Sequence, residues 1–415
     1  MAKRILFVVP YVPNLIRVRP YNLIRHLAEL GHEITLLTLW SDDQEKASLE
    51  FIQPYVRRVV AVRLRLWRSL WNCLVALPSR KPLQSVYCWE PALAEELDRV
   101  IGSQNGKTPF DVVHVEHLRG APYGLYIRDA LAQRAGSATP VVWDSVDSIS
   151  LLFRKAAGKS KSLFGRSVTR LELGRTERYE GWLLNQFDRV TVTSQVDRQA
   201  LLSLAGADLD DDHISVVPNG VDLDYFRPHP EVERADSTLI LTGKMSYHAN
   251  VSMVLFFVQE VMPLIWEKLP ATKLWVVGKD PAREVLSLND HANILITGTV
   301  EHLPPYLQEA TISVAPIPYG VGIQNKVLEA MACEIPVVAS SQAVSALQVR
   351  SGQELLVADA PREYAGIILD LLQDEKARRR IGEAGRRYVE RHHHWSNVAQ
   401  NLNQVYEAAM GSAAG

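Results

Sequence analysis

The sequence has few of the features that mark secreted, membrane-spanning or nucleic-acid-binding proteins. Its three cysteines, Cys73, Cys88 and Cys333, are an odd number without the spacing of a metal site or redox pair, so we expect a reduced, cytoplasmic environment. No apolar run approaches the ~18 residues that a membrane-spanning helix needs. Only five apolar residues lie between Arg4 and Pro10, which predicts a strand instead of a signal peptide. The formal net charge of -2 argues against nucleic acid as a partner.

Short apolar runs alternate with helical patterns along the whole chain. The first series is RILFVVP, EITLLTL, DVVHVE, PVVWDS, RVTVTS and ISVVPNG, and the second is TLILTG, TKLWVVG, NILITG, TISVAPI and IPVVAS. Runs of this kind, separated by helices, are typical of parallel strands covered on both faces. A chain of 415 residues is also too long for one ordinary core. The sequence therefore predicts an α/β protein with two doubly wound domains.

The two series are separated by a charged, proline-containing stretch without periodicity, residues 222–237. Residues 361–410 show helical patterns only. Ligands of open parallel sheets bind at the carboxyl ends of the strands, so the loops after the strands are where we look for chemistry.

One such loop opens a short helix with the sequence GIQNKVLEAMACEIPVV, residues 322–338. A helix N-terminus presents unpaired N–H groups and a partial positive charge, which suit a phosphate or diphosphate. Gly322 lets the backbone approach a ligand, Gln324, Asn325 and Lys326 add donors, and Glu329 follows one turn later. A capped helix with solvated side chains explains the same residues. Neither a Walker motif nor Gly-x-Gly-x-x-Gly is present. The function of an ATPase or of a dinucleotide-dependent oxidoreductase therefore lacks its usual sequence support.

Further motifs resemble those of family 4 glycosyltransferases, most closely bacterial exopolysaccharide-associated members. They are VVPNGVDLDYF (216–226), TGKMSYHANV (242–251), VVGKDP (276–281), ITGTVEHLPPYLQEATISVAPI (296–317) and NKVLEAMACEIPVVAS (325–340). The resemblance implies the GT-B fold, two Rossmann-like domains facing across a cleft. It places the acceptor domain at 1–225, with a helix at about 394–410 crossing back onto it, and the donor domain at 236–393. It also implies sugar transfer from a nucleotide diphosphate sugar with retention, without a metal or another cofactor.

The family's donor motifs match unevenly. Glu329 stands where relatives hold the ribose hydroxyls, whereas Val321 replaces their sugar-binding glutamate. In the family's Gly-Arg motif this chain has Gly243 and Lys244, and Ala249 replaces the lysine that follows. We expect Lys326 to supply the missing charge at the diphosphate, helped by Asn325 and Gln324, and backbone groups near Gly298 to read the base.

The first domain offers fewer matches. Its first loop contains Asn14, Arg17 and Arg19 in place of the family's Gly-Gly pair, and Arg19 is a candidate phosphate ligand. Asp144 replaces a histidine that many relatives carry near the reacting sugar, and Asp147 lies in the same loop. Either carboxylate can orient a hydroxyl, accept the acceptor's proton, or simply cap a helix. Glu116 and His117 are weaker candidates.

Two segments of the first domain, 51–89 and 154–170, are rich in basic residues and contain no acids. Tryptophan and leucine alternate with these basic residues in the first segment, a combination typical of contact with anionic lipid. A solvated basic face explains the segments equally well.

Together these features predict a glycosyltransferase that elongates a polysaccharide or lipid-linked glycan at the cytoplasmic face of a membrane. Asp144, Lys244 and Lys326 are the predicted catalytic residues. A non-catalytic nucleotide-sugar-binding partner, or an epimerase or phosphorylase of the same fold, is the alternative.

Overall fold

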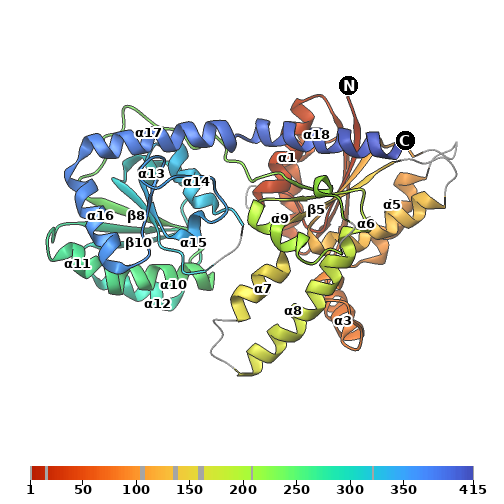
Figure 1. Cartoon of the computed structure of the whole chain (residues 1–415), viewed down its shortest axis with the longest axis horizontal. Helices are drawn as coiled ribbons and strands as arrows, with labels where there is room; N and C mark the ends of the chain where they lie inside the picture. The colour runs from red at the N-terminus through yellow and green to blue at the C-terminus, as the bar shows by residue number, and fades with distance from the viewer. Residues whose placement is uncertain are drawn as a thin grey trace. The chain divides into compact units, whose positions relative to one another are not determined.

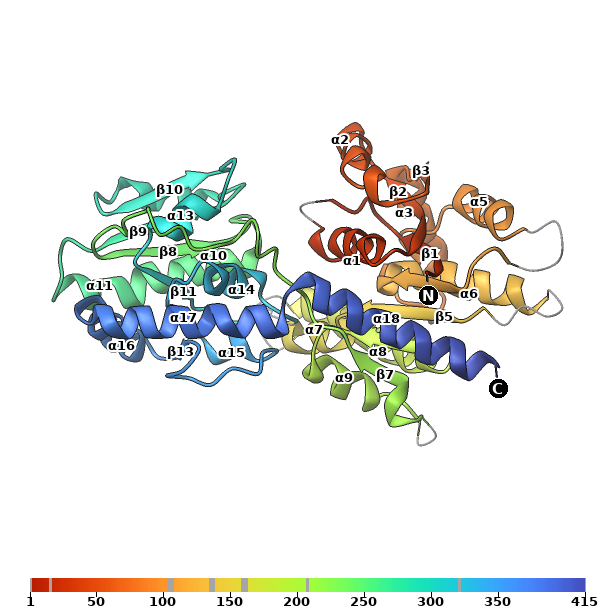
Figure 2. The same ribbon diagram turned by 90° about the horizontal axis from the view of Figure 1, so that it is seen from above.

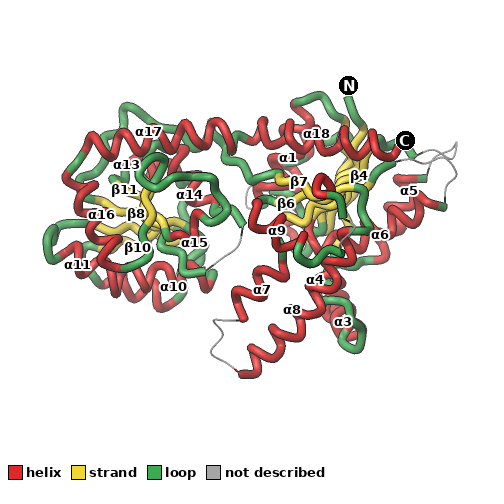
Figure 3. The backbone as a smooth tube through the Cα atoms, in the orientation of Figure 1, coloured by secondary structure: helices red, strands yellow, loops and turns green. Residues whose placement is uncertain are grey.

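We analysed a computed structural model, which describes all residues except 1, 15–16, 103–107, 134–138, 158–162, 207–208, 320–321 and 415. The chain forms two compact units, each with its own sheet at the centre and helices around it (Figure 3). The N-terminal unit comprises Met1–Pro218 and Trp395–Gly415, and the C-terminal unit comprises Asn219–His394.

The N-terminal unit contains a seven-stranded, wholly parallel sheet in the order β3-β2-β1-β4-β5-β6-β7. The strands are β1 (Arg4–Val9), β2 (Glu33–Trp40), β3 (Arg58–Arg63), β4 (Val112–Glu116), β5 (Val141–Val146), β6 (Arg189–Val192) and β7 (Ile214–Val216). The helices are α1 (Val18–Glu29), α2 (Asp43–Ala47), α3 (Leu66–Ala76), α4 (Leu83–Val86), α5 (Pro91–Ile101), α6 (His117–Ala132), α7 (Ile149–Ala157), α8 (Leu163–Leu184), α9 (Gln195–Leu202) and α18 (Trp395–Ala414).

Strand β1 explains why the sequence shows unbroken apolar runs. Leu6 and Val8 pack into the core on one face of the sheet, whereas Ile5 and Phe7 pack into the core on the other. Because successive side chains of a strand point to opposite faces, a strand covered on both faces must be apolar throughout.

The last helix, α18, belongs to the N-terminal unit and packs beside α1 (Figure 1). Its Trp395 is 2% exposed, and the Tyr406 hydroxyl lies 2.9 Å from His114 Nδ1 at the centre of the sheet. This burial explains why the helix returns to the first unit, as the family resemblance implies.

The C-terminal unit contains a six-stranded parallel sheet in the order β10-β9-β8-β11-β12-β13. Figure 2 labels β10, β9, β8, β11 and β13 one after another in this order. The strands are β8 (Thr238–Thr242), β9 (Lys273–Val277), β10 (Ile294–Gly298), β11 (Ile312–Ala315), β12 (Val337–Ala339) and β13 (Leu356–Val357). The helices are α10 (His248–Phe256), α11 (Met262–Trp266), α12 (Arg283–Leu286), α13 (Pro304–Glu309), α14 (Asn325–Ala332), α15 (Ser341–Val344), α16 (Pro361–Gln373) and α17 (Glu375–His392).

The first stretch of the N-terminal unit ends at Pro218, seven residues before the end predicted for the first domain. Val221 and Leu223 are buried in the core of the C-terminal unit, and the Val221 N–H donates to the His393 carbonyl at 2.7 Å. The second unit therefore begins within the PNGVD motif, at Asn219.

One helical stretch of the described chain, His248–Trp266, is long and apolar enough to cross a membrane. The sequence analysis did not anticipate it, because Asn250, Gln259 and Glu260 interrupt the apolar run. A π-helical turn, Phe257–Val261, joins α10 to α11 within it. Met253, Phe257 and Ile265 are fully buried in the core, which accounts for the apolar composition of one face.

Candidate functional site

The mouth of α14 and the loop after β8 form one polar cluster in the C-terminal unit. Lys326, on the first turn of α14, donates from Nζ to Asn250 Oδ1 at 2.6 Å. The Asn250 amide is held in this orientation because its Nδ2 donates to the Lys244 carbonyl at 2.9 Å. The structure thus brings Lys326 to the start of α10, next to Ala249, where the family's lysine is missing. Asn250 was not predicted, because no spacing links residues 76 positions apart.

Gly243 permits this close approach. Its φ is +146°, and a Cβ there would lie 2.8 Å from Asn250 Nδ2 and 3.1 Å from Lys326 Nζ. Gly278 packs against the Gly243 carbonyl, where a Cβ would come within 1.7 Å of its oxygen. A glycine pair therefore lets the loop after β8 lie beside the helix mouth, as the Gly243 prediction requires.

The remaining residues of the mouth are arranged around the N-terminus of α14. Gly322 has a left-handed φ of +68°, and Gln324 is the N-cap residue. Asn325 Oδ1 is buried and has no hydrogen-bond partner among the described residues. The predicted sugar-contact position, Val321, lies outside the described residues together with Gly320.

Burial shifts the pKa of both charged groups at this mouth. It lowers the pKa of Lys326 to about 8, although the nearby Glu329 carboxylate raises it. Burial also raises the pKa of Glu329 to about 7, although the nearby charge of Lys326 lowers it. Both groups lose hydration in the free protein, so an anionic ligand with hydroxyl donors would compensate them.

Lys244, predicted to be catalytic, and Gly298, predicted to bind the donor, lie in the same unit at more open positions. Lys244 is 55% exposed and lies 3.7 Å from the Asp280 carboxylate. Gly298 ends β10 with a φ of +69°, and no atom lies within 4 Å of a Cβ built there. Gly298 is the last residue of β10 and Lys244 follows β8 by two residues, so both lie at the carboxyl ends of strands, where ligands of parallel sheets bind.

In the N-terminal unit the predicted residues Arg19 and Asp144 form a buried ion pair. Arg19 Nε donates to Asp144 Oδ2 at 2.9 Å, and these side chains are 5% and 0% exposed. Asp144 Oδ1 accepts from the Val146 N–H at 3.1 Å. Although burial opposes ionisation, Arg19 lowers the pKa of Asp144. This geometry favours a role for Asp144 in positioning Arg19 over the catalytic role predicted for it.

The second predicted carboxylate, Asp147, is engaged by Thr193, whose hydroxyl donates to it at 3.0 Å. At the start of α7 the Ser148 hydroxyl accepts from the Leu151 N–H at 3.3 Å, which assigns the capping contact there to Ser148. Burial raises the pKa of Asp147 to about 6.

The weaker candidate Glu116 lies beside Asp144 in the strand register. Tyr11 donates to it at 2.6 Å, and burial raises its pKa to about 8. Val146 and His117 adopt left-handed φ values of 67° and 68° at the ends of β5 and β4. Such strain in non-glycine residues clusters at functional sites, which marks this edge of the sheet.

Two arginines at the same edge line a pocket of about 290 Å³. Arg17 stacks on Tyr11 at 4.5 Å, and Arg119 stacks on Tyr87 at 5.5 Å. Arg17 Nη1 and Arg119 Nε are buried and have no hydrogen-bond partner in the part of the chain that the structure describes. The sequence analysis missed Arg119, which lies in the first turn of α6 and has no motif around it.

Within the described ranges, no group of three histidine, cysteine or acidic residues is placed to hold a metal ion.

Two doubly wound parallel sheets define the GT-B class of glycosyltransferase folds. The structure of Anabaena Alr3699/HepE in complex with UDP and glucose superposes with a TM-score of 0.65 at 15% identity, covering 98% of this chain and all of that one. Sucrose-phosphate synthase from Thermosynechococcus elongatus superposes with the same TM-score at 19% identity, covering 99% of this chain and all of its own. These similarities confirm the predicted fold class.

The sequence comparisons specify the family. Residues 17–225 match the family described as Glycosyltransferase Family 4, and residues 236–374 match Glycosyl transferases group 1. The chain belongs to glycosyltransferase family 4, which confirms the resemblance seen in its motifs.

Curated relatives align over parts of the chain. A phosphatidyl-myo-inositol mannosyltransferase of Mycobacterium tuberculosis is 27% identical over 48% of this chain and 55% of its own length. The aligned region thus spans about half the length of that relative. A GDP-mannose-dependent alpha-(1-6)-phosphatidylinositol monomannoside mannosyltransferase of Mycolicibacterium smegmatis is 25% identical over 76% of this chain and 80% of its own.

Proposed function

We propose that this protein transfers a sugar from a nucleotide diphosphate sugar to a glycan or lipid-linked acceptor, with retention and without a metal. The observation that carries the proposal is the cluster of Lys326, Asn250 and Gly243 at the mouth of α14. It combines a cation, a glycine that admits close approach and a helix N-terminus, three features that suit a diphosphate.

In this proposal Lys326 and the first turn of α14 stabilise the charge that develops on the departing diphosphate. Glu329, about one turn further along, accepts hydrogen bonds from the ribose hydroxyls. The donor's own phosphate oxygen takes the acceptor's proton as the glycosidic bond opens. The protein then contributes orientation and charge stabilisation, and no strong base is required.

The comparisons support the kinds of substrate. The named relatives are mannosyltransferases whose names specify phosphatidylinositol-type acceptors, and one named relative is GDP-mannose-dependent. The HepE structure holds UDP and glucose on the same fold. On the basis of these names we propose the same kinds of substrate for this chain: a nucleotide-sugar donor and a glycan or lipid-linked acceptor.

We further propose that α3 carries the protein to the cytoplasmic face of an anionic membrane. Its exposed residues include Trp67, Leu70 and Leu74, each more than half exposed. Segment 51–89 around α3 contains no acid, whereas Arg154 of the second basic segment is already paired with Glu177 at 2.6 Å. Sedimentation with phosphatidylcholine vesicles, with and without phosphatidylglycerol, tests this: absence from both pellets contradicts it.

A thermal-shift screen of UDP, GDP, ADP, CMP and dTDP sugars, followed by product analysis, tests the transferase proposal. A bound donor raises the melting temperature with the logarithm of its concentration over its Kd. We expect transfer that persists in EDTA, with the donor's anomeric configuration retained in the product by NMR. Binding without any turnover would favour the non-catalytic partner. Turnover without a sugar acceptor, or with free phosphate, would favour an epimerase or a phosphorylase.

A further inference from the structure

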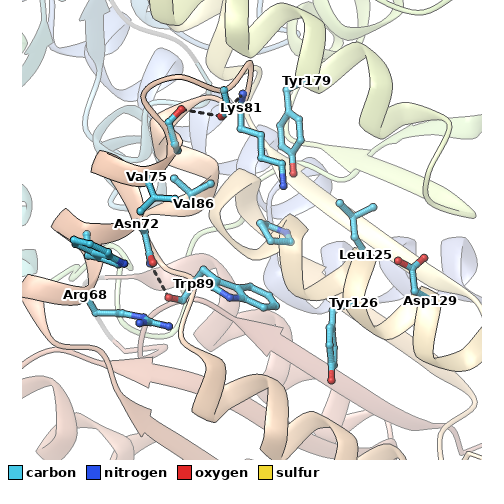
Figure 4. A pocket seen from close by; sticks show the side chains of 14 residues that line it. Arg68, Asn72, Val75, Lys81, Val86, Trp89, Leu125, Tyr126, Asp129 and Tyr179 are labelled. Atoms are coloured by element: carbon cyan, nitrogen blue, oxygen red, sulfur yellow. Dashed lines mark hydrogen bonds between the residues drawn. The ribbon is translucent and has the colours of Figure 1, made fainter.

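A pocket of about 630 Å³ lies against α3 in the N-terminal unit, and none of the residues that line it is among those assigned above to the donor (Figure 4). Its volume is in the range of small-molecule sites. Side chains of α3, the segment after it, α6 and α8 form its walls: Arg68, Trp71, Asn72, Val75, Ala76, Ser79, Lys81, Val86, Trp89, Pro122, Leu125, Tyr126, Asp129 and Tyr179.

The walls of this pocket are largely apolar. Trp71 and Val75 extend from α3, while Trp89 stacks on Tyr123 with ring centroids 4.8 Å apart. Asn72, a polar residue of the wall, already donates to the Trp89 carbonyl at 2.7 Å (Figure 4). An apolar ligand would therefore replace water in this pocket without stripping Asn72 of its partner.

Two cations accompany this apolar wall. Arg68 Nε is buried and has no hydrogen-bond partner among the residues that the structure describes, and Lys81 also lines the pocket. The acid of the lining, Asp129, is paired with Arg128 at 3.2 Å. A buried donor without an acceptor costs free energy, which an anionic ligand group would recover.

The outer side of α3 continues the apolar surface. Leu66, Trp67 and Leu70 are between 58% and 66% exposed, and Arg65 and Arg68 lie next to Leu66 and Trp67 in the sequence. Exposed apolar side chains flanked by cations are complementary to an amphiphile with an apolar chain and an anionic head.

We propose that this pocket binds the hydrocarbon chain of a lipid-linked acceptor, with Arg68 and Lys81 contacting its phosphate. Only one part of this proposal rests on the proposed function, namely that the bound lipid is the acceptor of the transfer reaction. The hydrocarbon chain would pass from the membrane surface beside α3 into the pocket. It would thereby hold the head group of the lipid on the N-terminal unit.

Alkyl phosphates below their micelle concentrations test the pocket without donor or membrane. We expect binding, seen as a change in tryptophan fluorescence, to strengthen about fourfold for each methylene that becomes buried, from octyl to decyl to dodecyl phosphate. Inorganic phosphate should bind far more weakly than dodecyl phosphate. An affinity independent of chain length would overturn the proposal.

A matched pair of variants locates the site. Val75→Trp places a bulky ring at the pocket, whereas Leu74→Trp adds the same ring to a neighbouring residue, equally exposed, outside the lining. We expect at least a tenfold loss of dodecyl phosphate affinity for Val75→Trp and less than twofold for Leu74→Trp. Equal effects would assign binding to the outer face of α3 and contradict the pocket. If Val75→Trp fails to fold, Val75→Phe takes its place, because its ring is also larger than the Val75 side chain that lines the pocket.

The outcomes separate this proposal from the proposed function. Alkyl phosphate binding without any nucleotide-sugar transfer would leave the lipid pocket standing and refute the transferase. Transfer to a water-soluble acceptor without alkyl phosphate binding would do the reverse.

Discussion

Replacing Lys326 with methionine separates a structural role from a ligand-binding role. Methionine keeps the length of the side chain but removes the charge that lies 2.6 Å from Asn250. A hydrogen bond from a charged group to a phosphate contributes about 1.5–3 kcal/mol. We therefore expect the affinity for the nucleotide diphosphate that best stabilises the protein to fall by roughly 10- to 150-fold.

Stability should respond differently. The folded protein lowers the pKa of Lys326 from 10.5 to about 8, so the unfolded chain holds this proton more tightly. The resulting cost to folding is on the order of 3 kcal/mol below pH 8 and disappears as the pH rises to 10.5. Lys326→Met removes that cost but leaves Asn250 Oδ1 without its donor, a penalty of about 1–3 kcal/mol. The free energy of unfolding should consequently stay level or rise at pH 7.

Isothermal titration calorimetry with the nucleotide and urea denaturation at pH 7 measure the two quantities. Lys273→Met is the control, because Lys273 is exposed at the amino end of β9, the edge opposite the proposed site. We expect it to change neither affinity nor stability appreciably. If Lys326→Met binds nucleotide as tightly as the unaltered protein, or loses several kcal/mol of stability, Lys326 is a structural residue and the diphosphate assignment is refuted.

Three further predictions concern the same two sheet edges. Because burial raises the pKa of Glu329 to about 7, nucleotide affinity should decrease as the pH is lowered through this value and the carboxylate gains a proton. Glu329→Gln should bind the nucleotide more weakly, and its affinity should not depend on pH in calorimetry at about pH 5.5 to 7.5. Asp144→Asn should lower the free energy of unfolding, measured by urea denaturation, by about 3–5 kcal/mol, since it leaves the Arg19 guanidinium buried without its carboxylate. Adding Arg19→Met should recover part of that loss. If the losses of the two single variants simply add in the double variant, the pairing is contradicted. Gly243→Ala should lower the free energy of unfolding by about 1–3 kcal/mol, because φ at this position is +146°, and should weaken nucleotide binding. Gly366→Ala, with open space around it in α16, should be neutral or stabilising. Equal melting temperatures of the two variants would refute the conformational argument.

The sequence predicted most strands because parallel strands covered on both faces carry a strong apolar signal. Strand β3 was missed, since its edge position leaves its residues only partly buried between basic neighbours. The two-residue strand β13 was missed because it is too short to show any pattern. The predicted helix at about 394–410 corresponds to α18, although only family resemblance, and no periodicity, gave its return to the first unit.

The candidate donor residues were predictable where a motif follows a strand. Lys326 and Glu329 stand out by their position at a helix mouth, but the contact between Lys326 and Asn250 depends on how the loop after β8 packs against α14. Sequence spacing carries no record of such packing. The buried N–H groups of Arg68, Arg17 and Arg119 are likewise visible only once the surrounding side chains are placed.

Asp144 shows why a polar residue at a sheet edge is ambiguous in sequence. Its match to a histidine that relatives carry near the reacting sugar predicted a group facing substrate, but Arg19 and the Val146 N–H occupy its two oxygens. Burial also raises the pKa of the neighbouring Glu116 to about 8, which favours its neutral form at pH 7. One carboxylate is thus held ionised by an arginine, and the other is held neutral by burial. Neither arrangement provides an accessible base, so the transfer proposed above depends on the donor's own phosphate to take the proton.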